Sequence, residues 1–401
     1  MQKQPSVKKS SSKFDLSLNS AMGFVILIGI VSLFADMTYE GARSIAGPYL
    51  AILGANAVVV GFVAGLGELL GYGLRFVSGF VADKSGKYWS ITIIGYVLNL
   101  LSVPLLAVAG YWQVAALLLI LERVGKAIRT PARDAMLSHA AEKIGMGWGF
   151  GLHEALDQTG ALLGPLLMAA VLYYHEGYRN GFALLIIPAL LAFAVLAFAR
   201  KRYPNPQDLA LKLPSLETKG FTSLFWLYLA GAALVAAGYA DFPLIAYHFE
   251  KTKVLTNSAL IPVAYAFAMG ISGLAAPVFG HLYDRKGFII LIFITLISAF
   301  FSPCVFLGGA SLAFIGVALW SLGIAAQETL MRAIVGNMIG SQKRASAYGV
   351  FNLGYGVFWF LGSILLGYLY DVSIDLLIIF SVVVQLLSLP VFILVLKRMK
   401  E

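Results

Sequence analysis

The chain has 401 residues, of which 60% are hydrophobic and only 12% are charged, and its formal net charge is +9 at pH 7. Its mean hydropathy of +0.84 excludes an ordinary soluble domain and indicates a membrane protein. The positive charge is explained by the loops described below, so we expect no nucleic-acid partner. A spanning helix needs about 20 mostly apolar residues, which leaves room here for roughly a dozen.

Apolar windows separated by polar breaks predict twelve membrane-spanning helices. Residues 1–19 are polar and carry several lysines, and the apolar run after them is too long for a signal sequence, so we expect a cytoplasmic tail and no cleavable signal. The predicted spans are residues 20–46, 56–82, 88–109, 113–136, 147–173, 180–200, 221–247, 257–283, 287–307, 311–339, 345–370 and 374–396.

Lysine and arginine are unevenly distributed among the predicted loops. One set of alternate loops holds most of them, including the cluster at residues 200–202, whereas the other set holds little beyond Arg179, Lys251 and Lys253. The positive-inside rule therefore places both termini in the cytoplasm, which requires an even number of spans. We expect a multi-pass protein of the inner (plasma) membrane.

A polar linker, residues 201–220, separates two halves of the chain. Residues 20–200 and residues 221–396 each hold six predicted spans, and a short cytoplasmic tail follows at residues 397–401. The sequence therefore predicts two six-helix bundles joined by a cytoplasmic linker.

The two halves share a loop motif, G-x-x-x-D-[KR]-x-G. It begins at Gly79 in the first half and, 201 residues later, at Gly280 in the second. A glycine at this place lets one helix approach its neighbour closely, and an acid beside helix-terminal cations can form a charge cluster that opens and closes as a gate. Halves repeated in parallel place a substrate site near the bilayer midplane, between the two bundles.

With this repeated motif, the chain resembles the major facilitator superfamily of secondary transporters over nearly its whole length. The residues similar to that superfamily's cytoplasmic signature are Gly79, Asp83, Lys84, Gly86 and Lys87, with a second copy at Gly280, Asp284, Arg285 and Gly287. The resemblance implies an all-α membrane protein with the MFS fold, in which 12 transmembrane helices form two pseudo-symmetric six-helix bundles. We expect Arg129 and Arg133 to pair with Asp83 or Asp134 at the gate.

The fifth predicted span carries a second family signature. Gly151, Gly160, Gly164 and Pro165 reproduce the spacing that, within the superfamily, is typical of proton-driven exporters, although Met168-Ala169 stands where the family has two more glycines. The resemblance therefore implies a drug:proton antiporter-like exporter. Glycines used for helix packing alone are the other interpretation.

Titratable side chains occur within the predicted spans. A charge at the bilayer centre costs at least about 2.5 to 3.5 kcal/mol, so such groups usually face the bundle interior and function there. The candidates for proton coupling or substrate binding are Asp36, Glu40, Arg43, Glu68, Arg75, Glu122, Arg123, Glu154, Asp157, Asp241 and Glu328. Most of the acids lie in the first half, and Asp36 is the first choice for the coupling acid. The alternative is salt bridges that only fix the helices, between Asp36 or Glu40 and Arg43, and between Glu68 and Arg75.

Aromatic side chains are expected to form the rest of the cavity wall, where they suit amphipathic or cationic organic ligands. They are Tyr39, Tyr72, Tyr239, Tyr247, Tyr265, Trp320, Tyr355 and Trp359.

We predict a proton-coupled exporter of a small organic compound that works as a monomer, without a cofactor or a metal site. The chain has no HExxH, CxxC, phosphate-loop or G-x-S-x-G motif, so no enzyme activity is predicted. Three alternatives stay open. They are a symporter that imports an anionic nutrient bound by Arg75, Arg123 or Arg332, an exporter of a metal chelate or siderophore, and a sensor or scaffold without a substrate.

Overall fold

The computed structural model describes residues 11–174, 177–204, 221–338 and 344–399, and the regular structure within these ranges is helical throughout. Most of the predicted linker, residues 205–220, and the outer parts of both predicted tails lie outside the described residues. The helices are α1 (Ser11–Ile52), α2 (Ala57–Ser85), α3 (Tyr88–Leu105), the 3-10 helix η1 (Leu106–Val108), α4 (Trp112–Ile144), α5 (Met146–Tyr173), α6 (Gly177–Leu184), α7 (Ile186–Arg202), α8 (Ser223–Gly238), α9 (Phe242–Thr252), α10 (Leu260–Lys286), α11 (Ile289–Ser298), α12 (Phe301–Leu307), α13 (Ala310–Met338), α14 (Arg344–Val372) and α15 (Ile374–Arg398).

These helices form the predicted spans in the predicted order. Within the described residues, eleven helical segments are long and apolar enough to cross a membrane. The remaining long helix, α4, has 33 residues and carries several charged side chains, Glu122 and Arg123 among them. Together they account for the twelve predicted spans, and the all-α fold class is confirmed.

Three spans are broken into two helices each: α6 with α7, α8 with α9, and α11 with α12. In each case a proline lies in the first turn of the second helix, at Pro188, Pro243 or Pro303. Proline has no N–H to donate to the preceding turn, and in the first turn of a helix that N–H has no partner to lose. Proline also lies inside unbroken helices of this protein, such as Pro165 in α5, so it favours these breaks without being sufficient for one.

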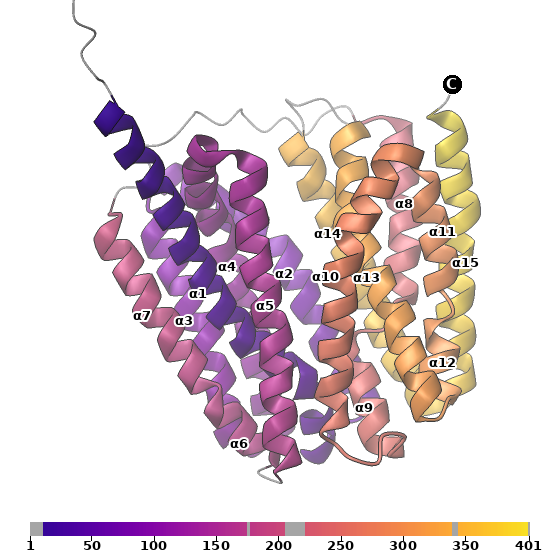
Figure 1. Ribbon diagram of the computed structural model, residues 1–401. Helices are drawn as coiled ribbons and strands as arrows, with labels where there is room; N and C mark the ends of the chain where they lie inside the picture. Colours follow the sequence, from indigo (N-terminus) through magenta and orange to yellow (C-terminus); the bar gives the residue numbers. More distant parts are fainter. Residues whose placement is uncertain (1–10, 175–176, 205–220, 339–343, 400–401) are drawn as a thin grey trace, which may run out of the picture.

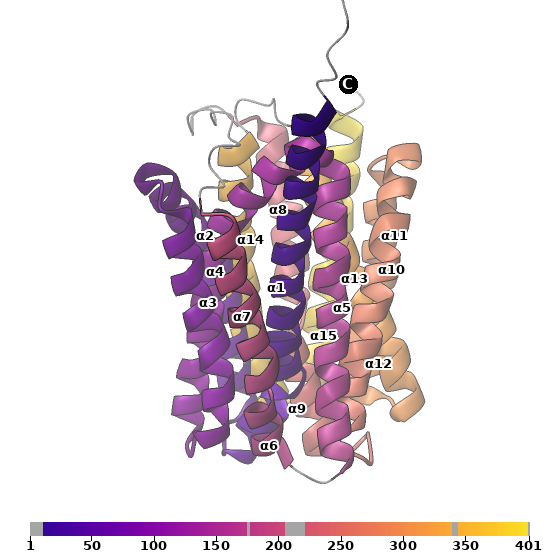
Figure 2. The same ribbon diagram turned by 60° about the vertical axis from the view of Figure 1, so that its left-hand side comes forward.

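The first and second halves of the chain lie side by side (Figure 1), with α1 to α7 in one half and α8 to α15 in the other. The start of α1 and the end of α15 are at the same end of the molecule, which we call the terminal face; α6, α9 and α12 are at the opposite face. Turned by 60°, the molecule again shows α1 beside α5 (Figure 2), one of its most extensively packed helix pairs.

Near the opposite face the two halves are in backbone contact. A Cβ added at Gly47 of α1 would lie 1.9 Å from the carbonyl oxygen of Pro243 in α9, and one at Gly61 of α2 would lie 2.2 Å from that of Ser363 in α14. Only glycine permits such an approach. The carboxylate of Asp371, at the end of α14, also accepts hydrogen bonds of 3.4 and 3.3 Å from the backbone at the start of α2.

The last glycine of each motif copy ends a helix. Gly86 follows α2 with a φ of 65°, and Gly287 follows α10 with a φ of 70°. Positive φ is a conformation that glycine adopts without steric cost, so the motif glycines stop the two equivalent helices at equivalent places.

Candidate functional site

A cavity of about 860 Å³ lies between the two halves. Helices α1, α2, α4 and α5 line it from the first half, and α10, α13 and α14 line it from the second. Its lining extends from Tyr265 and Trp320 in the middle of the molecule to Asp134, Phe150 and Gly280, which lie toward the terminal face. The cavity therefore extends to the terminal face, while the halves meet on the other side of it.

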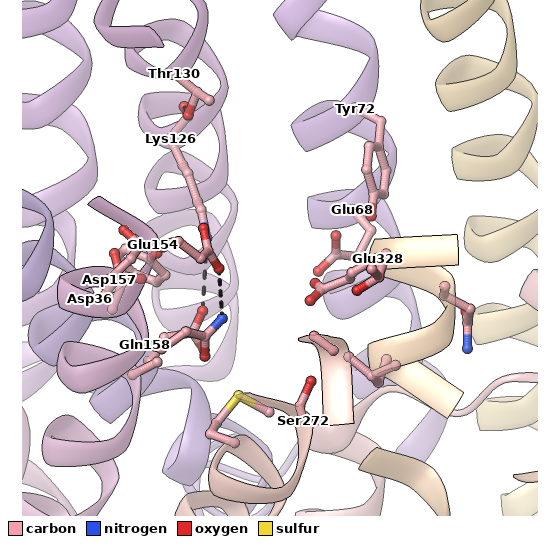
Figure 3. A pocket seen from close by; sticks show the side chains of 18 of the residues that line it. Asp36, Glu68, Tyr72, Lys126, Thr130, Glu154, Asp157, Gln158, Ser272 and Glu328 are labelled. Carbon is pink, nitrogen blue, oxygen red and sulfur yellow. Dashed lines mark hydrogen bonds and ion pairs between the residues drawn. The ribbon is translucent and has the colours of Figure 1, made fainter. Parts of the chain in front are cut away.

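Nine of the predicted coupling and substrate residues line this cavity. They are Asp36, Glu40, Arg43, Glu68, Arg75, Arg123, Glu154, Asp157 and Glu328. Glu122 and Asp241 do not line it, but both contact residues that do. Figure 3 shows Asp36, Glu154 and Asp157 on one side of the space, with Glu68 and Glu328 on the other.

Salt bridges connect the deepest of these charges across helices. Arg43 of α1 lies 2.8 Å from Glu68 of α2, and Arg123 of α4 lies 3.5 Å from the same carboxylate oxygen. Arg123 also lies 3.3 Å from Glu122, whose carboxylate accepts a 2.8 Å hydrogen bond from Asn99. Glu68 thus pairs with two arginines from other helices, which the alternative of salt bridges within one helix did not include.

Glu40 connects the two halves. Its carboxylate lies 3.8 Å from Lys126 of α4 and accepts a 2.6 Å hydrogen bond from the hydroxyl of Tyr265 on α10. Lys126 also lies over the ring of Tyr39, 4.0 Å from the ring centre. Glu40 is thus bound by its own half and by the other half.

Asp241 lies at the break between α8 and α9, where it precedes the first residue of α9. Its carboxylate accepts hydrogen bonds of 2.9 Å from Trp359 and 2.7 Å from Ser363, both on α14. It also lies 3.7 Å from Arg43, which belongs to the other half. This acid, which is only 2% exposed, forms a second polar contact between the halves.

Asp36 and Asp157 form a carboxyl pair between α1 and α5. Asp36 is only 3% exposed, and the two carboxyl groups lie within hydrogen-bonding reach of each other (Figure 3). One oxygen of each has no hydrogen-bond partner, and within the described residues neither carboxylate forms a salt bridge. Gly160 makes this contact possible, because a Cβ there would lie 3.0 Å from the Cβ of Asp36 and 2.1 Å from the carbonyl oxygen of Leu33.

A hydrogen-bonded cluster lies on the terminal side of this pair. The ring nitrogen Nε2 of His153 lies 2.9 Å from the hydroxyl of Ser32, which also accepts a 3.1 Å hydrogen bond from Arg133. Arg133 forms a 2.8 Å salt bridge with Asp134, as one of the gate pairings predicted. The sequence interpretation did not include Ser32, although its place one helical turn before Asp36, in an apolar span, was an available signal.

The other gate residues do not form the expected charge cluster in this conformation. Arg129 packs on the ring of Tyr96, 4.4 Å from its centre, and within the described residues it forms no salt bridge with Asp83 or Asp134. Asp83 instead accepts a 3.0 Å hydrogen bond from Tyr88. A Cβ at Gly79 would make an ordinary contact of 3.4 Å with Pro131 of α4, so the approach of these two helices does not require glycine at this position. The exposed gate residues are Asp83, Lys84, Lys87, Asp284 and Arg285.

The glycines of the fifth-span motif differ in their surroundings. A Cβ at Gly160 or Gly164 would collide with the backbone of α1, at 2.4 Å from the carbonyl oxygen of Met37 in the case of Gly164, whereas one at Gly151 would meet nothing within 4 Å. Pro165 is buried within α5. Two of the three glycines thus bring α5 onto α1.

Comparison with known proteins agrees with this architecture. A family model described as Major Facilitator Superfamily matches residues 20–363. The chain is similar to an uncharacterized protein of Mycobacterium tuberculosis, with 41% identity over 377 residues that cover 92% of each chain. It is also similar to an uncharacterized MFS-type transporter of Methanocaldococcus jannaschii, with 27% identity over 95% of this chain and 96% of the relative. Among solved structures, a nucleoside transporter has the same fold, with a TM-score of 0.72 at 14% identity over 92% of this chain and all of that one.

Proposed function

Because the chain belongs to the Major Facilitator Superfamily and is therefore a secondary transporter and not an enzyme, we propose that it exports a small organic compound in exchange for protons. The observation that carries this proposal is the carboxyl pair of Asp36 and Asp157 at the cavity wall. It is the acidic group whose oxygens are in contact with each other and whose charge is not balanced by a salt bridge.

The pair suits the binding of one proton. Two carboxylates in contact repel each other, so a proton held between them stabilises the pair. Water can reach Asp157 from the cavity, while Asp36 behind it is almost fully buried. A substrate that binds beside the pair and a proton that binds within it would then compete, and this competition is the basis of exchange.

The polar contacts between the halves support alternating access. Arg43 keeps Glu68 as a partner in its own half if it loses Asp241, and Asp241 keeps Trp359 and Ser363. When the halves separate at the opposite face, Arg43 therefore keeps a salt bridge and Asp241 keeps two hydrogen bonds, which reduces the cost of parting two buried charges.

Export is supported by the resemblance of the fifth span to the signature of proton-driven exporters, in which Gly160 and Gly164 bring α5 onto α1. The alternative, import of an anionic nutrient, is less well supported. Arg123, one of its proposed ligands, is held by Glu68 and Glu122, and the side chain of Arg332 lies outside the described residues.

We further propose that this multi-pass membrane protein resides in the inner (plasma) membrane as a monomer with both termini in the cytoplasm. The cavity, which extends to the terminal face, is then accessible from the cytoplasm in this conformation, as loading of an exported compound requires.

The test first identifies a ligand and then measures whether its transport is coupled to protons. Thermal unfolding of the purified protein against a panel of metabolites and drugs at two pH values identifies compounds that stabilise the folded state. Proteoliposomes with an imposed pH gradient are then assayed for accumulation of such a compound. We expect Asp36→Asn and Asp157→Asn to lose gradient-driven accumulation even at compound concentrations that compensate for any weaker binding, and the exposed control Asp375→Asn to keep it. Full gradient-driven transport by Asp36→Asn would contradict the proposal.

A further inference from the structure

The two walls of the cavity differ in chemistry. The wall formed by α1 and α5 presents the carboxyl groups of Asp36, Glu154 and Asp157. The facing wall presents three aromatic rings at four-residue intervals along α14, those of Phe351, Tyr355 and Trp359. The ring centres of Phe351 and Tyr355 are 5.9 Å apart, and those of Tyr355 and Trp359 are 5.5 Å apart. A ligand in the space between them contacts acid on one side and ring faces on the other.

The basic side chains of the cavity are largely neutralised by the wall itself. Arg43 and Arg123 share Glu68, Lys126 pairs with Glu40, and Arg133 pairs with Asp134, all within 3.8 Å. A negatively charged ligand would have to displace these acids from their partners.

Within the described residues, Asp36, Glu154 and Asp157 form no salt bridge. Glu154 is exposed to the cavity, where it accepts a 2.9 Å hydrogen bond from the neutral side chain of Gln158. Asp36 and Asp157 contact each other, and each keeps one oxygen without a hydrogen-bond partner, although Asp36 is only 3% exposed. Lys126 and Arg133 of α4 lie near this pair, but each also has an acid of its own, so Glu154 and the pair still present carboxylate oxygens to a ligand even with one proton shared between Asp36 and Asp157.

We infer that the transported compound is an aromatic organic cation, whose positive group binds at Asp36, Glu154 and Asp157 and whose ring system lies against Tyr355 and Trp359. The inference rests on the proposed transport through this cavity and adds the class of substrate. A cation beside a carboxylate forms charge-assisted hydrogen bonds, and a cationic aromatic compound stacks favourably on aromatic faces. The volume of about 860 Å³ falls within the range of pockets that hold one drug-sized molecule.

The binding experiment uses ethidium, a planar and permanently charged aromatic cation, with the full-length protein in nanodiscs of zwitterionic lipid. Ethidium fluorescence is titrated against empty nanodiscs as the blank. Three competitors then separate charge from shape: naphthylmethyl-trimethylammonium, its cyclohexylmethyl counterpart without an aromatic ring, and naphthalenesulfonate, an anion of similar size. We expect the aromatic cation to displace ethidium at the lowest concentration and the sulfonate to displace it least.

Variants test which residues produce this preference. Because a hydrogen bond to a charged group contributes about 1.5–3 kcal/mol, we expect Glu154→Gln and Asp36→Asn each to weaken ethidium binding by at least about tenfold. Tyr355→Leu removes a ring and is expected to weaken binding by about 2- to 30-fold, more than Tyr355→Phe, which keeps the ring. The exposed acid Asp375 lies outside the cavity, so Asp375→Asn is the matched control. Glu154 is exposed, and Glu154→Gln therefore tests the charge even if Asp36→Asn does not fold.

The outcomes separate this inference from the exchange mechanism. Equal competition by the sulfonate, unchanged affinity in Glu154→Gln, or a failure of every cationic probe to bind overturns the cationic substrate class. If ethidium binds as expected but moves through proteoliposomes without counter-movement of protons, the substrate class stands and proton exchange fails. If the protein transports an anion in a proton-driven manner and binds none of the cations, proton exchange stands and the cationic substrate class fails.

Discussion

Substitution of Gly160 by alanine tests whether the contact between α1 and α5 is as close as the structure has it. The added Cβ would lie 2.1 Å from the carbonyl oxygen of Leu33. Ordinary carbon–oxygen contacts in proteins are about 3.3–3.6 Å, so the two helices would have to separate by about 1.2 Å. The obstacle is backbone and cannot be relieved by a change of rotamer.

Gly151 provides a matched control on the same helix, because a Cβ there meets nothing within 4 Å. Alanine favours a helix over glycine by up to about 1 kcal/mol, and both variants gain this term. The difference between the two variants in free energy of unfolding is therefore the cost of overpacking at Gly160, about 1–3 kcal/mol. We expect Gly160→Ala to be less stable than Gly151→Ala by this amount, and Gly151→Ala to be at least as stable as the wild type.

The measurement is the free energy of unfolding in mixed detergent micelles, with the unfolded fraction followed by tryptophan fluorescence and circular dichroism. Gly160→Ala should also carry Asp157 away from Asp36 and reduce gradient-driven transport more than Gly151→Ala does. Equal stability of the two variants would refute the reasoning, because it would mean that α5 does not touch the backbone of α1.

Three further predictions concern contacts among the charges and between the halves. Gly61→Leu would place a side chain against the carbonyl of Ser363, so we expect it to hold the halves apart at the opposite face, measured as a longer distance between spin labels on α2 and α14. Arg43→Ala removes the cation beside the buried carboxylate of Asp241 and one of the two arginines beside Glu68, so we expect a loss of about 3–5 kcal/mol in unfolding free energy, with Arg43→Lys less affected. Asp371→Asn weakens the interaction with the start of α2, and we expect a loss of only about 0.3–1 kcal/mol, measured in the same unfolding assay. A large loss for Asp371→Asn, or none for Arg43→Ala, would contradict these assignments.

The spans could be predicted from the sequence because the bilayer sets their length, so each appears as an apolar window of nearly fixed size. The breaks within them were missed, since hydropathy does not register a helix start inside an apolar window. The sequence does contain a signal at one of them, where Asp241 precedes Phe242-Pro243. An acid before a proline is a typical helix N-terminus.

The residues that line the cavity were easier to predict than the partners with which they form salt bridges and hydrogen bonds. Titratable groups in spans must face the interior, and so Asp36, Glu68 and Asp157 line the cavity as predicted. Partners depend on which helices surround each residue, which spacing along one helix does not reveal. Seven residues of helix extend about 10 Å, so Asp36 meets α5 while Arg43, on the same face of α1, meets α2 and α9.

The polar contacts that hold the halves together at Glu40 and Asp241 are few, and Glu40, Arg43 and Asp241 each have a second polar partner in their own half. If each contributes the net value of an ordinary hydrogen bond, about 0.5–1.5 kcal/mol, they bias the resting equilibrium by only a few kcal/mol. Reversing a 99:1 preference takes about 5.5 kcal/mol of differential affinity, which a drug-sized ligand can supply. Under the proposed exchange, binding of a proton or of a ligand in the central chamber is therefore enough to decide which side of the bilayer the chamber faces.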